Sequence, residues 1–218
     1  MNDKSDEIKK NYAIMNETED NQNHPKQDAH LPRKIFHLLA ASIIPAIYYM
    51  QVLSWQVSAA LVVTATIIWA GADFYRLYHP AFNKFALRLL GPLLKVRETA
   101  QVTSSSYILI ASSLVILFLD REIACASLFF IALGDPAAAL GGKFFGSIRF
   151  ANGKSLEGTV AMFVVCLWVG LTITSSEDIA LVGALAAALA ELYAFGLDDN
   201  LAVPIFSGLA MSAVAMLV

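Results

Sequence analysis

Seven long apolar segments, separated by short polar connections, constrain the fold of this 218-residue chain more than any other feature. Hydrophobic residues make up 57% of the sequence and charged residues only 15%, well below the share of about 25% that is usual in soluble domains. A helix needs roughly 20 mostly apolar residues to cross a bilayer, where its backbone polar groups must bond internally. The sequence therefore predicts an all-α integral membrane protein. The expected spans are 33–50, 55–73, 104–119, 123–141, 158–174, 179–196 and 201–218.

The distribution of Lys and Arg predicts the orientation of these spans, because basic residues of short loops are retained on the cytoplasmic side. Basic residues gather in the connections after spans two and four, whereas the three opposite connections carry only Arg121. Seven crossings then place the N-terminus in the cytoplasm and the C-terminus outside. This multi-pass topology brings the polar motifs to the cytoplasmic face.

Residues 1–31 differ in composition from the rest of the chain. They carry seven acidic residues and four lysines with little apolar content. Such a segment cannot bury enough surface to offset its ordering entropy, so we expect a disordered polar tail followed by a membrane domain over residues 32–218. Cys125 and Cys166 lie within expected spans, and the pattern favours apolar packing over a disulfide or a metal site.

The connection between spans two and three has helical periodicity. Phe82, Phe85, Leu89 and Leu93 recur at helical spacing, with basic residues interleaved. This pattern predicts an amphipathic helix lying along the inner membrane surface. A solvated basic loop that obeys the positive-inside rule is the alternative.

Asp135 is the ionisable residue with the most informative position, near the inner end of span four and directly before Pro136. Proline interrupts the helical hydrogen-bond ladder, and an acid at membrane depth usually faces the bundle interior or a water-filled cavity. Mg²⁺ is typically held by one or two carboxylates together with phosphate oxygens and water. Asp135, Asp198 and Asp199 are therefore the predicted ligands of Mg²⁺ or another divalent cation.

Basic residues at the start of spans one and five predict anion binding. Arg33 and His37 share one face of the first turns of span one, beside Lys34, and cations at a helix N-terminus oppose the helix dipole unless an anion lies there. Simple anchoring of the span at the interface is the alternative. Lys154 precedes Ser155, an expected N-cap of span five whose free N–H groups suit a phosphate oxygen. The segment GKSLEG lacks the preceding glycine of a P-loop.

Five motifs, taken in order, resemble the family of CTP-dependent lipid-alcohol kinases, which includes dolichol, phytol and farnesol kinases and CTP-dependent diacylglycerol kinases. The motifs are RKIFH, the Glu98 region with TSSSY, GDPAAALGGKFFG, GKSLEGTVA and DDNLAVP. The resemblance covers residues 32 to about 210 and implies a lipid kinase with CTP as phosphoryl donor. Its implied functional residues are Arg33, Lys34, Asp135, Gly141 or Gly142, and Lys143, with Lys154, Asp198 and Asp199 downstream.

The motifs and the resemblance together predict phosphoryl transfer from a nucleoside triphosphate to the hydroxyl of a polyprenol, phytol-like isoprenoid or diacylglycerol. We expect membrane lipids as partners of the chain and no nucleic acid among them. Homo-oligomerisation is left open. Glu98 or His37 is the expected acceptor of the hydroxyl proton, and Glu191, an acid inside span six, either orients a basic partner or has a structural role. The expected nucleotide- and phosphate-binding residues are Gly134, Gly141, Gly142, Gly146, Lys154, Ser155 and Asn200.

Two other functions are compatible with parts of the pattern. A phosphatidate cytidylyltransferase-like enzyme would use the same cations and metal but release pyrophosphate. A small-molecule transporter would place its polar sites near the bilayer midplane, whereas most charges here lie at the inner ends of the spans.

Overall fold

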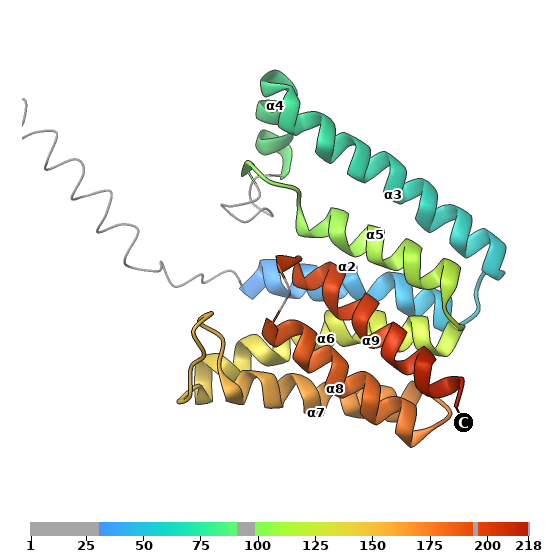
Figure 1. The fold of residues 1–218 in the computed structure, drawn as a ribbon. Coiled ribbons are helices and arrows are strands. Elements are labelled where there is room, and N and C mark those ends of the chain that lie inside the picture. The colour runs from blue at the N-terminus through green and yellow to red at the C-terminus, as the bar shows by residue number, and fades with distance from the viewer. Residues whose placement is uncertain (1–30, 91–98, 194–195, 218) are drawn as a thin grey trace, which may run out of the picture. The chain divides into compact units, whose positions relative to one another are not determined.

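The structure is a computed structural model that describes residues 31–90, 99–193 and 196–217 of the chain. These residues form eight α-helices, and their β-structure is limited to one bridge between Arg149 and Ser155 (Figure 1). The all-α class is therefore confirmed for the described ranges, while the expected tail lies outside them. The helices are α2 (Leu31–Tyr49), α3 (Trp55–Tyr78), α4 (Pro80–Leu90), α5 (Ser104–Phe118), α6 (Arg121–Phe145), α7 (Leu156–Ile173), α8 (Glu177–Tyr193) and α9 (Asp199–Ala215).

Each of the seven expected spans coincides with one helix, and α4 occupies the connection between the second and third. Among the described helices, α3, α6 and α7 are long and apolar enough to cross a membrane. The count of seven crossings and their orientation remain predictions. Two helices run beyond their expected ends: α3 continues past residue 73 to Tyr78, and α6 continues through Pro136 to Phe145.

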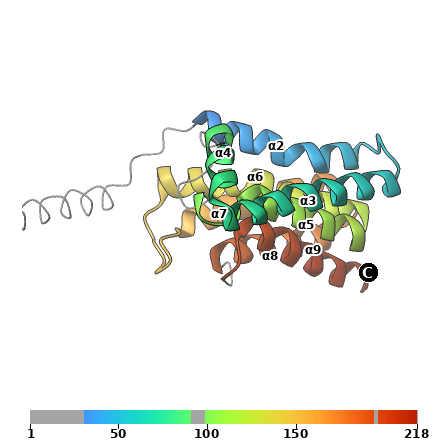
Figure 2. The ribbon, with the colours of Figure 1, turned by 90° about the horizontal axis from the view of Figure 1, so that it is seen from above.

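The amphipathic segment forms the helix α4, which lies across the end of α3 (Figures 1 and 2). Phe82, Phe85 and Leu89 are exposed along it, and Lys84 is also exposed. The helical form of the segment is confirmed over Pro80–Leu90, and its place at the membrane surface remains a prediction. Leu93 lies outside the described residues.

The chain from Ile35 onward packs as one compact unit, and Met1–Lys34 is counted apart from it. The largest buried cluster joins α6, α7, α8 and α9 around Phe130, Met162 and Met211, each fully buried. Cys166 is a buried free thiol of this cluster, and Cys125 is a buried free thiol of a second cluster around Ile116 and Leu128, which confirms the predicted packing role. Small residues bring the helices close, because a Cβ at Gly183 would meet Met211 at 2.5 Å.

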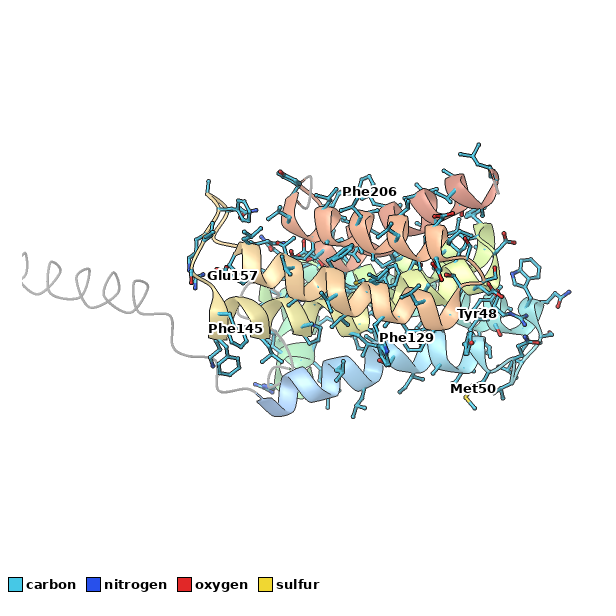
Figure 3. All side chains as sticks on the ribbon, turned by 90° about the horizontal axis from the view of Figure 1, so that it is seen from below. Tyr48, Met50, Phe129, Phe145, Glu157 and Phe206 are labelled. Carbon is cyan, nitrogen blue, oxygen red and sulfur yellow. The ribbon has the colours of Figure 1, made fainter. Side chains whose placement is uncertain are left out.

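The connections between successive helices alternate between two ends of this unit. At one end Trp55 donates from Nε1 to the Ile116 carbonyl (3.0 Å), and the Ser175 N–H donates to Glu122 (3.1 Å). Figure 3 shows Tyr48 and Met50 at this end, and Phe145 and Glu157 at the opposite one. We call the latter the polar end, defined by the connections 146–155 and 196–198. The motifs of expected spans four to seven therefore converge there.

Candidate functional site

The connection between α6 and α7 folds back on itself and presents two basic side chains. The Phe150 N–H donates to the Lys154 carbonyl (2.8 Å), and the Gly153 N–H donates to the Phe150 carbonyl (2.9 Å). Gly153 has a φ of 83°, in the left-handed region that favours glycine. This turn directs Arg149 and Lys154 toward the same pocket.

Side chains of α7 secure the two ends of this connection. Ser155 is the N-cap of α7 and accepts a hydrogen bond from the Gly158 N–H (3.1 Å), as its sequence position predicts. Glu157 accepts from the N–H groups of Ser147 (2.8 Å) and Ile148 (3.1 Å) through Oε1. Backbone donors that follow the end of α6 are thus satisfied by the first turn of α7.

A pocket of about 380 Å³ opens at the polar end between α6, the connection 146–155 and α8. It combines three basic side chains with two acidic ones, a composition suited to a ligand that carries anionic groups and a bound cation. Its lining residues are Asp135, Ala138, Ala139, Gly142, Lys143, Arg149, Gly153, Lys154, Ser155, Gly158, Thr159 and Glu191.

Lys154 is the residue that joins the connection to α8 and α9. Its Nζ lies 3.0 Å from Oε1 of Glu191 and 3.2 Å from Oδ2 of Asp199, and it also donates to the Glu191 carbonyl. The neighbouring Asn152 donates from Nδ2 to the Leu192 carbonyl at 2.6 Å. Lys154 is thus the basic partner of Glu191, and this ion pair is compatible with both expected roles of Glu191.

The start of α9 supplies further polar groups. Asp198 caps this helix by accepting from the backbone N–H (3.1 Å) and the side-chain amide (2.6 Å) of Asn200. Burial raises the pKa of Asp199, the charges of Asp135 and Asp198 raise it further, and Lys154 opposes that shift. Asp199, the second of the two aspartates at the start of α9, thus contacts a charged residue of the pocket, Lys154.

The glycines of the GDPAAALGG segment allow α6 and α7 to approach closely. A Cβ at Gly141 would meet Ala161 at 2.7 Å, and one at Gly134 would meet Cys166 at 2.9 Å. Gly142 faces the pocket, where a Cβ would meet Oγ of Ser155 at 2.8 Å. A Cβ at Gly146 would collide with the Gly142 carbonyl. Helix packing thus accounts for Gly134 and Gly141, and the predicted phosphate role of these glycines stays a prediction.

The structure brings part of the predicted site together. Asp135, Lys143, Lys154, Ser155 and Gly142 line one pocket, and Asp199 reaches it through Lys154. Other predicted residues are not related to the pocket by any described contact. Arg33, Lys34 and His37 lie in the first turns of α2, where only the backbone is described, and Glu98 lies outside the described residues.

The predicted metal site at Asp135, Asp198 and Asp199 stays a prediction. Over residues 31–90, 99–193 and 196–217, no three His, Cys, Asp or Glu side chains form a group that could hold a metal ion. Mg²⁺ commonly uses only one or two protein carboxylates, together with phosphate oxygens and water. The two carboxylates of Glu191 and Asp199, which both contact Lys154, are therefore compatible with a metal that arrives with a nucleotide.

Sequence reasoning missed Arg149 and Thr159 as pocket residues. Arg149 looked like one more basic residue of an inner loop, and Thr159 like part of an apolar span. The turn at Gly153 was the available signal for Arg149, because it folds the Arg149 segment back against Lys154.

The fold and the pocket define a class of protein: a bundle of apolar helices, three of them of membrane-spanning length, with a charged pocket at one end. Comparison with known proteins narrows this class. The chain is 28% identical over 212 residues to the CTP-dependent diacylglycerol kinase 1 of Saccharomyces cerevisiae, covering 84% of this chain and 73% of the relative. The protein of the same name from Eremothecium gossypii is 26% identical over 84% of this chain and 67% of its own length.

The CTP-dependent diacylglycerol kinase 1 of Schizosaccharomyces pombe is 29% identical over 62% of this chain and 71% of its own length. No family model matches the chain, and no solved structure matches it. The relatives confirm the resemblance carried by the ordered motifs. The chain is similar over most of its length to CTP-dependent diacylglycerol kinases, which supports the CTP-dependent lipid kinase family that the motifs resemble.

Proposed function

We propose that this protein transfers the terminal phosphoryl group of CTP to the hydroxyl of diacylglycerol at the cytoplasmic face of a membrane. The transfer forms a bond between phosphorus and the lipid oxygen, breaks the bond to the β-phosphate, and releases CDP and a proton. The observation that carries the proposal is the 380 Å³ pocket, which brings Asp135 and Lys143 of one motif together with Lys154 of the next. The printed names of the relatives support CTP and diacylglycerol as the substrates.

Phosphoryl transfer depends mainly on positioning and charge stabilisation. We assign Lys143, Arg149 and Lys154 to the triphosphate, because all three basic residues line the pocket. Mg²⁺, when bound with the nucleotide, would shield the phosphate charge from the attacking hydroxyl oxygen. We retain His37 and Glu98 as the proposed acceptors of the hydroxyl proton.

An apolar groove of about 490 Å³ lies on the other side of the α6–α7 pair and supports a lipid as the acceptor. Leu140, Phe144 and Val160 line it, and all three are exposed. The pocket residues Gly142 and Lys143 lie on the same turns of α6 as these groove residues. We place the hydrocarbon chains of the acceptor along this groove, with the hydroxyl reaching the charged pocket at the end of α6.

The direct test is incubation of the purified protein in detergent with labelled CTP or ATP and a panel of lipid alcohols. We expect CDP and phosphatidate from CTP and diacylglycerol, with polyprenol and phytol as competing acceptors in the panel. Pyrophosphate and a CDP-lipid from phosphatidate would instead establish a cytidylyltransferase. Failure of every alcohol to accept phosphate would exclude the lipid kinase.

The position of the lipid has its own test. Val160→Trp fills the apolar groove with a larger ring at an exposed site, so the fold should tolerate it. We expect a higher KM for diacylglycerol and an unchanged KM for CTP. Val164→Trp, one turn further along the exposed face of α7, is the matched control. Equal effects of the two substitutions would remove the groove from the proposal.

A further inference from the structure

The Lys154 ammonium group is surrounded by carboxylate and carbonyl oxygens. Its ammonium nitrogen is 3.0 Å from Oε1 of Glu191 and 3.2 Å from Oδ2 of Asp199, and it also contacts the Glu191 carbonyl. The Lys154 side chain is 25% exposed, so water competes only in part for these contacts. Two carboxylates and a carbonyl around one cation are the oxygen ligands that a hard divalent ion prefers.

Glu191 has one carboxylate oxygen that these contacts do not use. Oε2 of Glu191 is buried and has no hydrogen-bond partner among the described residues. The residue is only 7% exposed and lines the charged pocket. A buried acceptor without a partner costs free energy comparable to its desolvation, so this atom marks a position for a ligand that donates or carries positive charge.

The contacts of Lys154 leave one carboxylate charge in excess at this position. Glu191 and Asp199 share the single positive charge of Lys154. Asp135 lines the same pocket and is close enough to act on the charge of both carboxylates. Asp198, in contrast, accepts two hydrogen bonds from Asn200 and caps α9. Glu191 is thus better placed than Asp198 to bind a cation inside the pocket.

We propose that Glu191 and Asp199 are the protein ligands of the divalent cation, and that Lys154 occupies their oxygens until the metal–nucleotide complex binds. In the complex, Glu191 and Asp199 would bind the cation, and the Lys154 ammonium would bind the phosphates of the nucleotide. The proposal rests on the proposed function for the identity of the nucleotide. It keeps Asp199 from the predicted metal set and replaces Asp135 and Asp198 by Glu191. One cation is exchanged for another, so the buried carboxylates are paired in both states.

The test measures metal binding rather than turnover. Mn²⁺ bound to the purified protein in detergent is counted by electron paramagnetic resonance, with and without CDP. Glu191→Gln keeps the side-chain volume and removes the charge, and we expect it to weaken Mn²⁺ binding roughly tenfold or more. Glu177→Gln makes the same change at the exposed start of α8 and should leave binding as in the wild type. Equal Mn²⁺ affinity in the wild type and the Glu191 variant would overturn the proposal.

Lys154→Met tests whether the Lys154 ammonium competes with the metal for the two carboxylates or only forms a structural ion pair with them. Removing the competing ammonium should tighten Mn²⁺ binding in the absence of CDP and abolish the additional tightening that CDP gives the wild type. Weaker Mn²⁺ binding in this variant without CDP would overturn the exchange. If the variant does not fold, Asp199→Asn provides the second measurement, with the same expected loss of Mn²⁺ as Glu191→Gln.

Separate outcomes identify which proposal fails. Loss of Mn²⁺ from the Glu191 variant, in a wild-type protein that phosphorylates no lipid alcohol, supports the metal site and rejects the kinase. Kinase activity in the wild type, together with unchanged Mn²⁺ affinity in the Glu191 variant, supports the kinase and rejects the metal site.

Discussion

The carboxylate of Asp73 lies 2.5 Å from Nε of Arg76 one turn later in α3, and both side chains are 4% exposed. The second carboxylate oxygen of Asp73 accepts from Oγ of Ser106 (2.6 Å) and from the backbone N–H of Thr103 (2.7 Å). Arg76 in turn donates from Nη2 to the Gln101 carbonyl at 2.6 Å. The pair therefore fixes the chain before α5 against the end of α3.

The first prediction concerns this ion pair. Asp73→Asn should destabilise the protein by about 3–5 kcal/mol, because it leaves the buried Arg76 guanidinium without its counter-charge. The NH₂ group of the new amide would also face a hydrogen-bond donor, either Arg76 or Ser106, in place of an acceptor oxygen. Thermal unfolding in detergent, followed by tryptophan fluorescence, measures the loss. Asp178→Asn, in the exposed first turn of α8, should cost under about 1 kcal/mol. Equal melting temperatures for the two variants would disprove a structural role for the pair.

The positions of the helices followed from the sequence because apolar runs of sufficient length have few alternatives. The C-terminal end of α3 did not follow from it. The expected span ends at residue 73, but the helix continues to Tyr78, where Asp73 and Arg76 satisfy each other. Their other partners, Thr103 and Gln101, are far along the chain, and no periodic pattern links such residues.

In the candidate site, too, features set by neighbouring residues were predictable, whereas contacts between distant segments were not. The N-cap at Ser155 was predictable because capping is decided by neighbouring residues. The contact of Lys154 with Glu191 and Asp199 joins three segments of the chain. The sequence left open whether Glu191 orients a basic partner or has a structural role, because its contact with Lys154 depends on how α7, α8 and α9 pack.

The second prediction tests whether the glycines of α6 serve packing. Gly141→Ala would place a Cβ 2.7 Å from Cβ of Ala161 and 3.1 Å from the Glu157 carbonyl. We expect a loss of about 1–3 kcal/mol as α6 and α7 move apart. Gly71→Ala is the matched control in α3, because a Cβ there meets no atom within 4 Å. The control should be neutral or stabilise α3 by up to about 1 kcal/mol. A silent Gly141→Ala would contradict the packing role.

The third prediction concerns orientation in the membrane. Cys125 and Cys166 are fully buried, so a membrane-impermeant thiol reagent should report mainly on introduced cysteines. Cysteine at Ser54 or Ser175, both exposed at the end opposite the polar end, should react from outside the cell. Cysteine at Ser147, exposed in the connection after α6, should react only after the membrane is opened. Labelling of all three from one side would exclude the alternating topology.

The last prediction asks whether Lys143 binds phosphate or only obeys the positive-inside rule. Lys143 is exposed, lines the charged pocket and lies 5.9 Å from the ring centroid of Phe144. Lys and Arg are equivalent signals for membrane orientation, but Lys is a compact charge and Arg a planar fork. Lys143→Arg should therefore preserve insertion and lower phosphoryl transfer roughly tenfold or more, the scale lost when a stabilising group is misplaced by about 1 Å.

Lys84→Arg provides the control for this substitution, because Lys84 is exposed on α4 and does not line the charged pocket. The rate of transfer from labelled CTP to diacylglycerol should be unchanged in this variant. Both proteins should insert equally, as judged by thiol labelling at Ser147 in each background. Unchanged transfer in both variants would make Lys143 a topology signal, and the phosphate site would then rest on Arg149 and Lys154, which line the same pocket from the connection 146–155.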